Sequence, residues 1–162
     1  MDTGIKTIDI IVPCYNEEDV LKLFYEESSK VTDNISDYSC RYIFVDDGSR
    51  DKTLSILMEL SKEHENVKYI SFSRNFGKEA GIYAGLTHTC GDYVAFIDAD
   101  LQQRPEIALD MVDFLENNPD YDCVAAYQAE RREGKCLSFF KKLFYKLINM
   151  MCDIDFKQGA SD

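Results

Sequence analysis

Residues 93–102 have the sequence YVAFIDADLQ, an apolar run that ends in two carboxylates. The run Val94–Ile97 has the length of a strand, and its unbroken apolar character is typical of a parallel strand covered on both faces. Asp98 and Asp100 stand two positions apart, so in an extended segment their side chains point to one side. The alternative is a strand that ends in a polar loop, with Asp residues that cap the next helix.

These residues predict a cation site at the edge of a sheet. Open α/β sheets bind ligands outside the carboxyl ends of their strands, where Asp98 and Asp100 are expected to lie. Gln102 adds a neutral oxygen at the next alternate position. Hard divalent cations such as Mg²⁺ and Mn²⁺ prefer oxygen ligands of this kind.

The composition indicates one globular domain over residues 1–162, with 45% hydrophobic and 12% aromatic residues. No apolar run is long enough to span a membrane, and we expect no signal peptide before the first predicted strand. The six cysteines show no C-x-x-C spacing, so we expect reduced thiols of a cytosolic protein and no structural zinc.

Charge is distributed unevenly along the chain. The net charge of −12 argues against nucleic acid as a partner. Residues 131–146 carry six basic residues and one acidic residue, a local charge of +5, so the remainder carries −17. This basic segment is therefore expected to have a partner of its own.

Three further β-rich runs precede the carboxylate pair, at residues 8–12, 42–45 and 67–71. Pro13 is expected to stop the first, and Asn16 is expected to cap a helix that follows. The second ends in Asp46 and Asp47, which either bind a ribose or base or only organise the turn. Ser49 or Asp51 is expected to cap the next helix.

Two cationic side chains flank the start of the helix expected after residues 67–71. Arg74 and Lys78 stand at its start, a place suited to phosphate. The segment is not a P-loop, because Phe72 stands where the motif needs Gly. Gly77, Gly81 and Gly85 recur every four residues, which predicts a helix whose backbone packs closely on the sheet.

Residues 123–127 predict a fifth strand, and residues 137–151 alternate aromatic and aliphatic side chains with lysines. Such a basic amphipathic segment is typical of an interfacial helix on an anionic membrane. The alternative is a helix against which another part of the same protein packs. Strands that alternate with helices predict an α/β, Rossmann-like fold with a mostly parallel sheet flanked by helices.

The site motifs exclude some chemistries. No G-x-G-x-x-G follows the first strand, which counts against a dinucleotide cofactor, and no G-x-S-x-G elbow or Cys–His pairing presents a nucleophile. A metal-assisted transfer from a nucleotide-linked donor fits better, because a cation would offset repulsion between these carboxylates and a diphosphate.

Three motifs of the chain resemble the family 2 glycosyltransferases: Ile11–Glu18 (IVPCYNEE), Val45–Thr53 (VDDGSRDKT) and Asp98–Gln102 (DADLQ). Ser73–Glu79 (SRNFGKE) and the segment at Arg131 and Arg132 resemble the branch of polyprenyl-phosphate glycosyltransferases and dolichyl-phosphate mannose synthases. The resemblance implies a GT-A fold and an inverting, metal-dependent transfer of a sugar from a UDP- or GDP-sugar to a polyprenyl phosphate. It also implies work at the cytoplasmic face of the membrane, with residues 131–151 on its surface.

The resemblance implies site residues by position. The nucleotide-sugar would be bound by Pro13, Tyr15, Glu17, Asp46, Asp47, Lys78, Asp98, Ala99, Asp100 and Arg131. Asp100 and Gln102 would ligate Mg²⁺ or Mn²⁺, and Asp98 would orient the site. Asp162 resembles an acidic residue that precedes a Phe-Arg-Leu segment in this branch, so the catalytic set would be Asp98, Asp100 and Asp162.

Members of this branch are longer, often with membrane helices. We therefore expect the 162 residues to be the N-terminal, nucleotide-sugar-binding part of a catalytic domain, soluble by itself. Two alternatives stay open: a transferase that acts on a soluble or cell-surface polysaccharide precursor, and an inert nucleotide-binding fragment.

Overall fold

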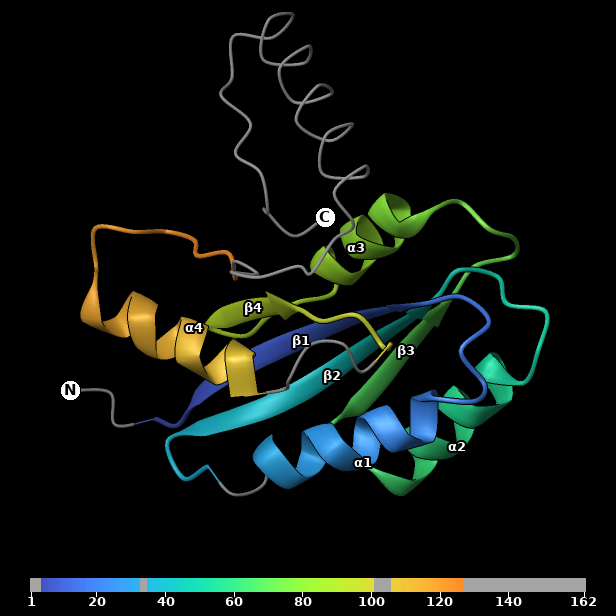
Figure 1. Ribbon diagram of the computed structural model, residues 1–162, viewed down its shortest axis with the longest axis horizontal. Coiled ribbons are helices and arrows are strands. Elements are labelled where there is room, and N and C mark those ends of the chain that lie inside the picture. Colours follow the sequence, from blue (N-terminus) through green and yellow to red (C-terminus); the bar gives the residue numbers. More distant parts are fainter. Residues whose placement is uncertain (1–3, 33–34, 101–105, 127–162) are drawn as a thin grey trace, which may run out of the picture. The chain divides into compact units, whose positions relative to one another are not determined.

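The structure, a computed structural model, describes residues 4–32, 35–100 and 106–126 (Figure 1). It contains β1 (Lys6–Cys14), α1 (Leu21–Thr32), β2 (Tyr38–Asp46), α2 (Thr53–Glu63), β3 (Val67–Ser71), α3 (Lys78–Leu86), β4 (Tyr93–Phe96) and α4 (Glu106–Asn117). Strands and helices alternate throughout the described residues, which confirms the predicted α/β fold.

The described strands form one parallel sheet in the order β3-β2-β1-β4. The chain steps from β1 outward through β2 to β3 and then returns to place β4 on the other side of β1. The strand order therefore reverses between β1 and β4, which makes their carboxyl ends the topological switch point where such sheets bind ligands.

Side chains along β1 and β2 point alternately to the two faces of the sheet, so each face carries part of the core. Ile10, Val12 and Phe44 point to the face covered by α1, α2 and α4, where Leu21, Phe24, Leu57 and Val112 join them. Ile11, Ile43 and Val45 point to the opposite face, where Ala84 of α3 packs. Figure 1 shows α1 and α2 on one side of the sheet and α3 on the other.

The glycine repeat of α3 does bring its backbone close to the sheet, as predicted. A Cβ at Gly81 would lie 3.7 Å from Cβ of Pro13, and one at Gly85 would lie 2.5 Å from Cγ2 of Ile11. Because α3 sits this near to β1, its N-terminus lies next to the residues that follow β1.

Three predictions about strands need correction. Pro13 does not stop β1, which continues to Cys14. The Ile11 carbonyl accepts from Ile97 on the β4 side and the Cys14 carbonyl accepts from Asp47 on the β2 side. Successive residues of a strand point their backbone N–H and C=O groups to opposite neighbours, so residue 13 points to the β4 side, as Ile11 does. The N–H that Pro13 lacks would therefore point to a side on which β4 has already ended.

β4 is not covered on both faces as its apolar run predicted. Val94 and Phe96 are 37% and 48% exposed. Residues 123–126 are not a strand in the described part of the chain, and Cys123 and Ala125 are exposed there. A segment with strand propensity forms a strand only when a neighbouring strand pairs with it, and none of the described strands pairs with these residues.

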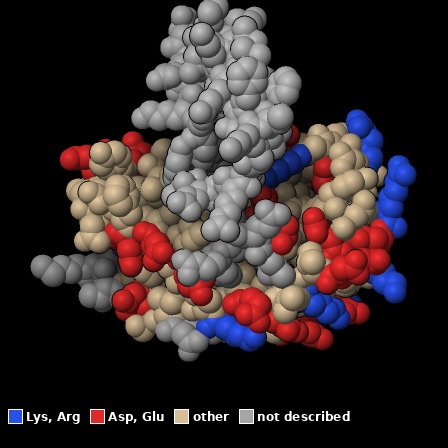
Figure 2. Space-filling model, viewed as in Figure 1, with Lys and Arg blue, Asp and Glu red and all other residues tan. Residues whose placement is uncertain are grey.

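Among the described residues, none of the helices combines the length and the apolar character that crossing a bilayer requires. The basic segment 131–151 lies outside the described residues. On the face shown in Figure 2, acidic side chains are spread over the described surface, in keeping with the net charge of −12.

Candidate nucleotide-sugar site

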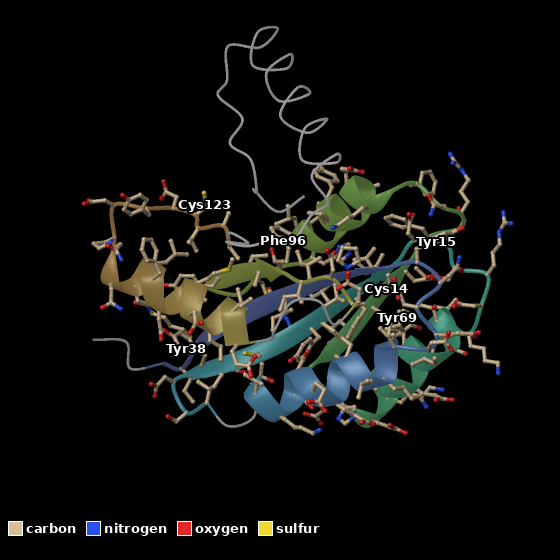
Figure 3. The ribbon with its side chains drawn as sticks, in the orientation of Figure 1. Cys14, Tyr15, Tyr38, Tyr69, Phe96 and Cys123 are labelled. Carbon is tan, nitrogen blue, oxygen red and sulfur yellow. The ribbon has the colours of Figure 1, made fainter. Side chains whose placement is uncertain are left out.

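A pocket of about 320 Å³ opens at the carboxyl ends of β1, β2 and β4, beside the start of α3. It is lined by Pro13, Cys14, Tyr15, Glu17, Asp47, Asn75, Gly77, Lys78, Gly81, Asp98, Ala99 and Asp100. Figure 3 shows Cys14 and Tyr15 where the chain leaves β1. The pocket thus lies at the topological switch point of the sheet.

The structure brings together most of the residues that the motifs single out. Eight of them line the pocket, from four separate stretches of the chain: Pro13, Tyr15, Glu17, Asp47, Lys78, Asp98, Ala99 and Asp100. Asp46 does not line it. Gln102, Arg131 and Asp162 lie outside the described residues, so their roles stay predictions.

Asp46 and Asp47 have different surroundings, although both are buried. Asp46 accepts hydrogen bonds from the backbone N–H of Ser49 at 3.0 Å and from the hydroxyl of Ser71 at 2.9 Å. It therefore organises the turn after β2 and ties it to β3. This geometry favours the structural alternative for Asp46.

Asp47 faces the pocket and holds the segment that leads into α3. Its two carboxylate oxygens accept from the backbone N–H of Phe76 at 2.6 Å and of Gly77 at 2.8 Å. Gly77 has a φ of 99°, a left-handed conformation that favours glycine. Asp47 thereby fixes one wall of the pocket and places Lys78 at its rim.

Lys78 and Asp98 form an ion pair across the pocket lining. The Lys78 ammonium lies 2.9 Å from Oδ1 and 3.0 Å from Oδ2 of Asp98. Both side chains are partly exposed, at 45% and 31%. Lys78 is the only Lys or Arg among the described lining residues, against the four carboxylates of Glu17, Asp47, Asp98 and Asp100.

This carboxylate excess changes the ionisation of Glu17. Burial raises the pKa of Glu17, and the negative charges of Asp100, Asp51 and Asp98 raise it further. A site in which carboxylates disfavour one another's charge is suited to a cation, and oxygen donors suit Mg²⁺ or Mn²⁺.

Within the described ranges, no three His, Cys, Asp or Glu side chains are arranged to hold a metal ion. Mg²⁺ is commonly held by one or two carboxylates together with substrate phosphates, so a donor set of few protein oxygens fits such an ion. Gln102, the second predicted ligand, lies outside the described residues.

Two basic and polar side chains do not act where the sequence predicted. Arg74 does not line the pocket, and its guanidinium carbon lies 4.0 Å from the ring centroid of Phe76. Asn16 does not cap α1, which begins at Leu21. Asn16 instead has a φ of 56° and accepts a hydrogen bond from the backbone N–H of Arg50.

Asp51 is not the N-cap of α2, because Lys52 holds that position without a side-chain cap bond, but Asp51 accepts from the backbone N–H of Thr53, the first residue of the helix, at 3.0 Å. Ser49 does not cap that helix. Its hydroxyl accepts from the backbone N–H of Asn16 at 2.9 Å.

Four lining residues were missed as binding residues: Cys14, Asn75, Gly77 and Gly81. The glycine spacing was a usable signal, because a close approach of α3 to β1 places the α3 N-terminus at the pocket. Cys14 is buried, and its burial, together with Glu17 and Asp46, raises the pKa of its thiol strongly. Cys14 therefore forms a neutral wall of the pocket.

Comparisons with known proteins agree with this geometry. A profile of the family "Glycosyl transferase family 2" matches residues 9–155. The chain is 39% identical over 155 residues to the putative glycosyltransferase CsbB of Bacillus subtilis, covering 96% of this chain and 46% of CsbB. It is 33% identical over 156 residues to the bactoprenol glucosyl transferase of Shigella phage SfX, covering 96% and 50%.

Solved structures show the same fold. S. aureus TarS 1-349 in complex with UDP-GlcNAc is 25% identical, with a TM-score of 0.55 over 70% of this chain and 32% of TarS. The mannosyltransferase PcManGT from Pyrobaculum calidifontis in complex with GDP-Man and Mn²⁺ is 23% identical, with a TM-score of 0.61 over 80% and 37%. These likenesses confirm the GT-A fold over the part of the domain that the chain covers.

The chain spans about half the length of the curated relatives that it matches. The family profile covers nearly the whole chain, and the pocket lies where its motifs converge. The chain is therefore a member of glycosyl transferase family 2.

Proposed function

We propose that this chain supplies the nucleotide-sugar-binding part of a metal-dependent, inverting glycosyltransferase that transfers a sugar to a polyprenyl phosphate. The observation that carries the proposal is the pocket at the switch point, in which one lysine faces four carboxylates. A nucleoside diphosphate needs cations for its phosphates and a neutral wall for its base and ribose; the pocket has Lys78, carboxylates that would hold a divalent cation, and Cys14 as a neutral wall.

Each wall of the pocket has a separate task in the proposed complex. Tyr15 and Asp47 border the nucleoside, and Lys78 exchanges its bond to Asp98 for one to a donor phosphate. Asp100 and Gln102 would hold the divalent cation, with Asp98 orienting the site. When bound, such an ion neutralises charge on the diphosphate as it leaves.

The transfer itself requires little proton chemistry from the protein. An oxygen of the acceptor phosphate forms a bond to the anomeric carbon while the bond from that carbon to the diphosphate oxygen breaks. A phosphate monoester is already ionised near pH 7, so the attacking oxygen has no proton to lose. The absence of a pocket-lining histidine among the described residues is consistent with this chemistry.

Calorimetry tests the donor site. UDP and GDP are titrated into the chain with Mn²⁺ and with EDTA, using the wild type, Asp100→Ala and the control Asp110→Ala. Asp110 is an exposed carboxylate on α4 outside the pocket lining. We expect Mn²⁺-dependent binding of one nucleotide, lost in Asp100→Ala and kept in Asp110→Ala. No binding of either nucleotide by the folded wild type would contradict the proposal.

The likeness to a bactoprenol glucosyl transferase supports the choice of a polyprenyl-phosphate acceptor. Residues 131–151 would then lie on an anionic membrane surface. Co-sedimentation with phosphatidylglycerol vesicles tests this, with phosphatidylcholine vesicles as the neutral control. Binding to the anionic vesicles alone is expected, whereas binding to neither would favour a soluble polysaccharide acceptor.

A further inference from the structure

The second half of the motif after β2 lies outside the pocket lining but is joined to the loop that carries Tyr15 and Glu17. The N–H of Asn16 donates to the Ser49 hydroxyl at 2.9 Å. In return, the N–H of Arg50 donates to the side-chain oxygen of Asn16 at 2.9 Å.

The same pattern repeats two residues further along both loops. The N–H of Glu18 donates to Oδ2 of Asp51 at 3.1 Å, and the N–H of Lys52 donates to the Glu18 carboxylate at 2.8 Å. Bonds run in both directions between segments more than 30 positions apart in the chain. Neither loop can shift without breaking bonds of the other.

Thr53 lies at the centre of this network and is fully buried. Its hydroxyl accepts from the N–H of Glu17 at 2.8 Å. Asp51 in turn accepts from the N–H of Glu18 and of Thr53. Burial raises the pKa of Asp51, but these hydrogen bonds outweigh burial and lower it, so the carboxylate is held ionised.

The loop that carries Tyr15 and Glu17 needs such support. Asn16 has a φ of 56°, in the left-handed region that non-glycine residues seldom adopt. The hydrogen bonds to Ser49, Thr53 and Asp51 hold the loop in this conformation.

We propose that Thr53 is a positioning residue of the donor site, which holds Tyr15 and Glu17 at the pocket by binding the Glu17 N–H and Asp51. The donor itself rests on the proposed function above. Thr53 does not line the pocket, so it would act through the loop alone.

Three variants separate positioning from general stability. Thr53→Val keeps the shape but neither accepts nor donates a hydrogen bond, and Thr53→Ser keeps the hydroxyl. Ser61→Ala is the matched control, because Ser61 donates to the Met58 carbonyl at 3.2 Å near the other end of α2. Each is compared with the wild type by amide hydrogen exchange and by UDP and GDP binding in Mn²⁺.

In the nucleotide-free protein, we expect Thr53→Val to speed exchange at the amides of residues 16–18 about tenfold, with the β1 and β2 amides unchanged. Thr53→Ser and Ser61→Ala should match the wild type. Equal exchange at residues 16–18 in Thr53→Val and the wild type, or faster exchange throughout the chain, would overturn the inference.

In the binding arm, we expect Thr53→Val to bind the preferred nucleotide about tenfold more weakly, with Thr53→Ser close to the wild type. Looser amides with unchanged affinity would overturn the positioning role. If the wild type binds neither nucleotide, the proposed function fails, and the exchange arm still decides whether Thr53 holds the loop.

Discussion

At the scale of single residues, Lys78 carries the positive charge that the described pocket lining offers to phosphate. Lys78→Met removes that counter-charge from the four lining carboxylates. We expect the affinity for a nucleoside diphosphate to fall about tenfold, a modest loss because the lysine is partly exposed. Lys78→Arg keeps the charge and should retain most of the affinity. Calorimetry in Mn²⁺ measures both, and equal affinity of Lys78→Met and the wild type would show that Lys78 stays with Asp98.

The thiols of the described chain should differ sharply in reactivity. Cys14 is 2% exposed, and burial together with nearby carboxylates raises its pKa, so its reactive thiolate is scarce at neutral pH. Cys90 and Cys123 are exposed. Iodoacetamide at pH 7.5 should modify Cys90 and Cys123 and leave Cys14 unmodified, as read by peptide mass spectrometry. Rapid modification of Cys14 in the folded chain would mean that the pocket wall opens.

Residue identity was a good guide to which side chains approach the pocket. It was a poorer guide to what each of them contacts. Aspartates at the carboxyl ends of buried strands must lie at one edge of a parallel sheet, so Asp47, Asp98 and Asp100 could be placed together. The division of tasks between Asp46 and Asp47 depends on Ser71 and Phe76, which other parts of the chain supply. No local pattern encodes those partners.

At the scale of elements, two glycines on the same helix should respond oppositely to alanine. At Gly81 a Cβ would have ordinary contact with Pro13 and Val45, so Gly81→Ala should stabilise the chain by up to about 1 kcal/mol through helix propensity. At Gly85 a Cβ would lie 2.5 Å from Ile11, so Gly85→Ala should destabilise it by about 1–3 kcal/mol. Urea unfolding measures both, and equal effects would contradict the close packing of α3 on β1.

The other end of the sheet is fixed by an ion pair that the sequence did not reveal. Asp9, inside the β1 run, is fully buried and accepts from Arg41 at 2.9 and 2.6 Å. It also accepts from the N–H of Cys90 and Gly91, which join β1 to the loop before β4. A charged residue among apolar neighbours, with an arginine at the paired position of the next strand, was the available signal.

This ion pair predicts a dependence of stability on pH. Burial raises the pKa of Asp9, but hydrogen bonds from Arg41 and the two N–H groups outweigh burial and lower it. A carboxyl group whose pKa is lowered by folding stabilises the folded chain at pH values above its ordinary pKa. That stabilisation is lost as the pH falls through the pKa of the folded state. Asp9→Asn should therefore cost about 3 kcal/mol at pH 7, because it leaves Arg41 without its counter-charge.

Urea unfolding from pH 7 to pH 3 measures the effect. The difference between the wild type and Asp9→Asn should narrow as pH falls below the ordinary carboxyl pKa of about 4, because the unfolded wild type then binds a proton that the folded Asp9 binds only at lower pH. Asp37→Asn, at an exposed position before β2, serves as the control and should change little. A difference that stays constant over this range would contradict the role of the Asp9 charge.

At the scale of the whole molecule, sequence patterns indicated the fold class because buried runs and turn residues alternate regularly. They failed where structure depends on pairing and covering: β4 is more exposed than its apolar run predicted, and residues 123–126 pair with no described strand. They also could not foresee Asn16 and Arg50 in contact, since loops 34 positions apart meet only once β1 and β2 align.

The pocket takes residues from the segments after β1, β2, β3 and β4, so it exists only when the whole sheet is assembled. A nucleotide that binds there should therefore stabilise the entire chain against unfolding. At 100 times its Kd the stabilisation should be about 2.7 kcal/mol, from mass action alone. The urea dependence of the unfolding free energy should stay unchanged, because the same surface is exposed on unfolding.

Urea unfolding with the preferred nucleotide and Mn²⁺ tests this, with Asp100→Ala at the same concentrations as the control that should show no shift. A nucleotide that binds by calorimetry but leaves the unfolding midpoint unchanged would be binding to the unfolded chain equally well. The site would then lie outside the assembled sheet, since only a ligand with equal affinity for both states leaves their equilibrium untouched. A full shift would show that binding requires the native arrangement of the four strands that the structure describes.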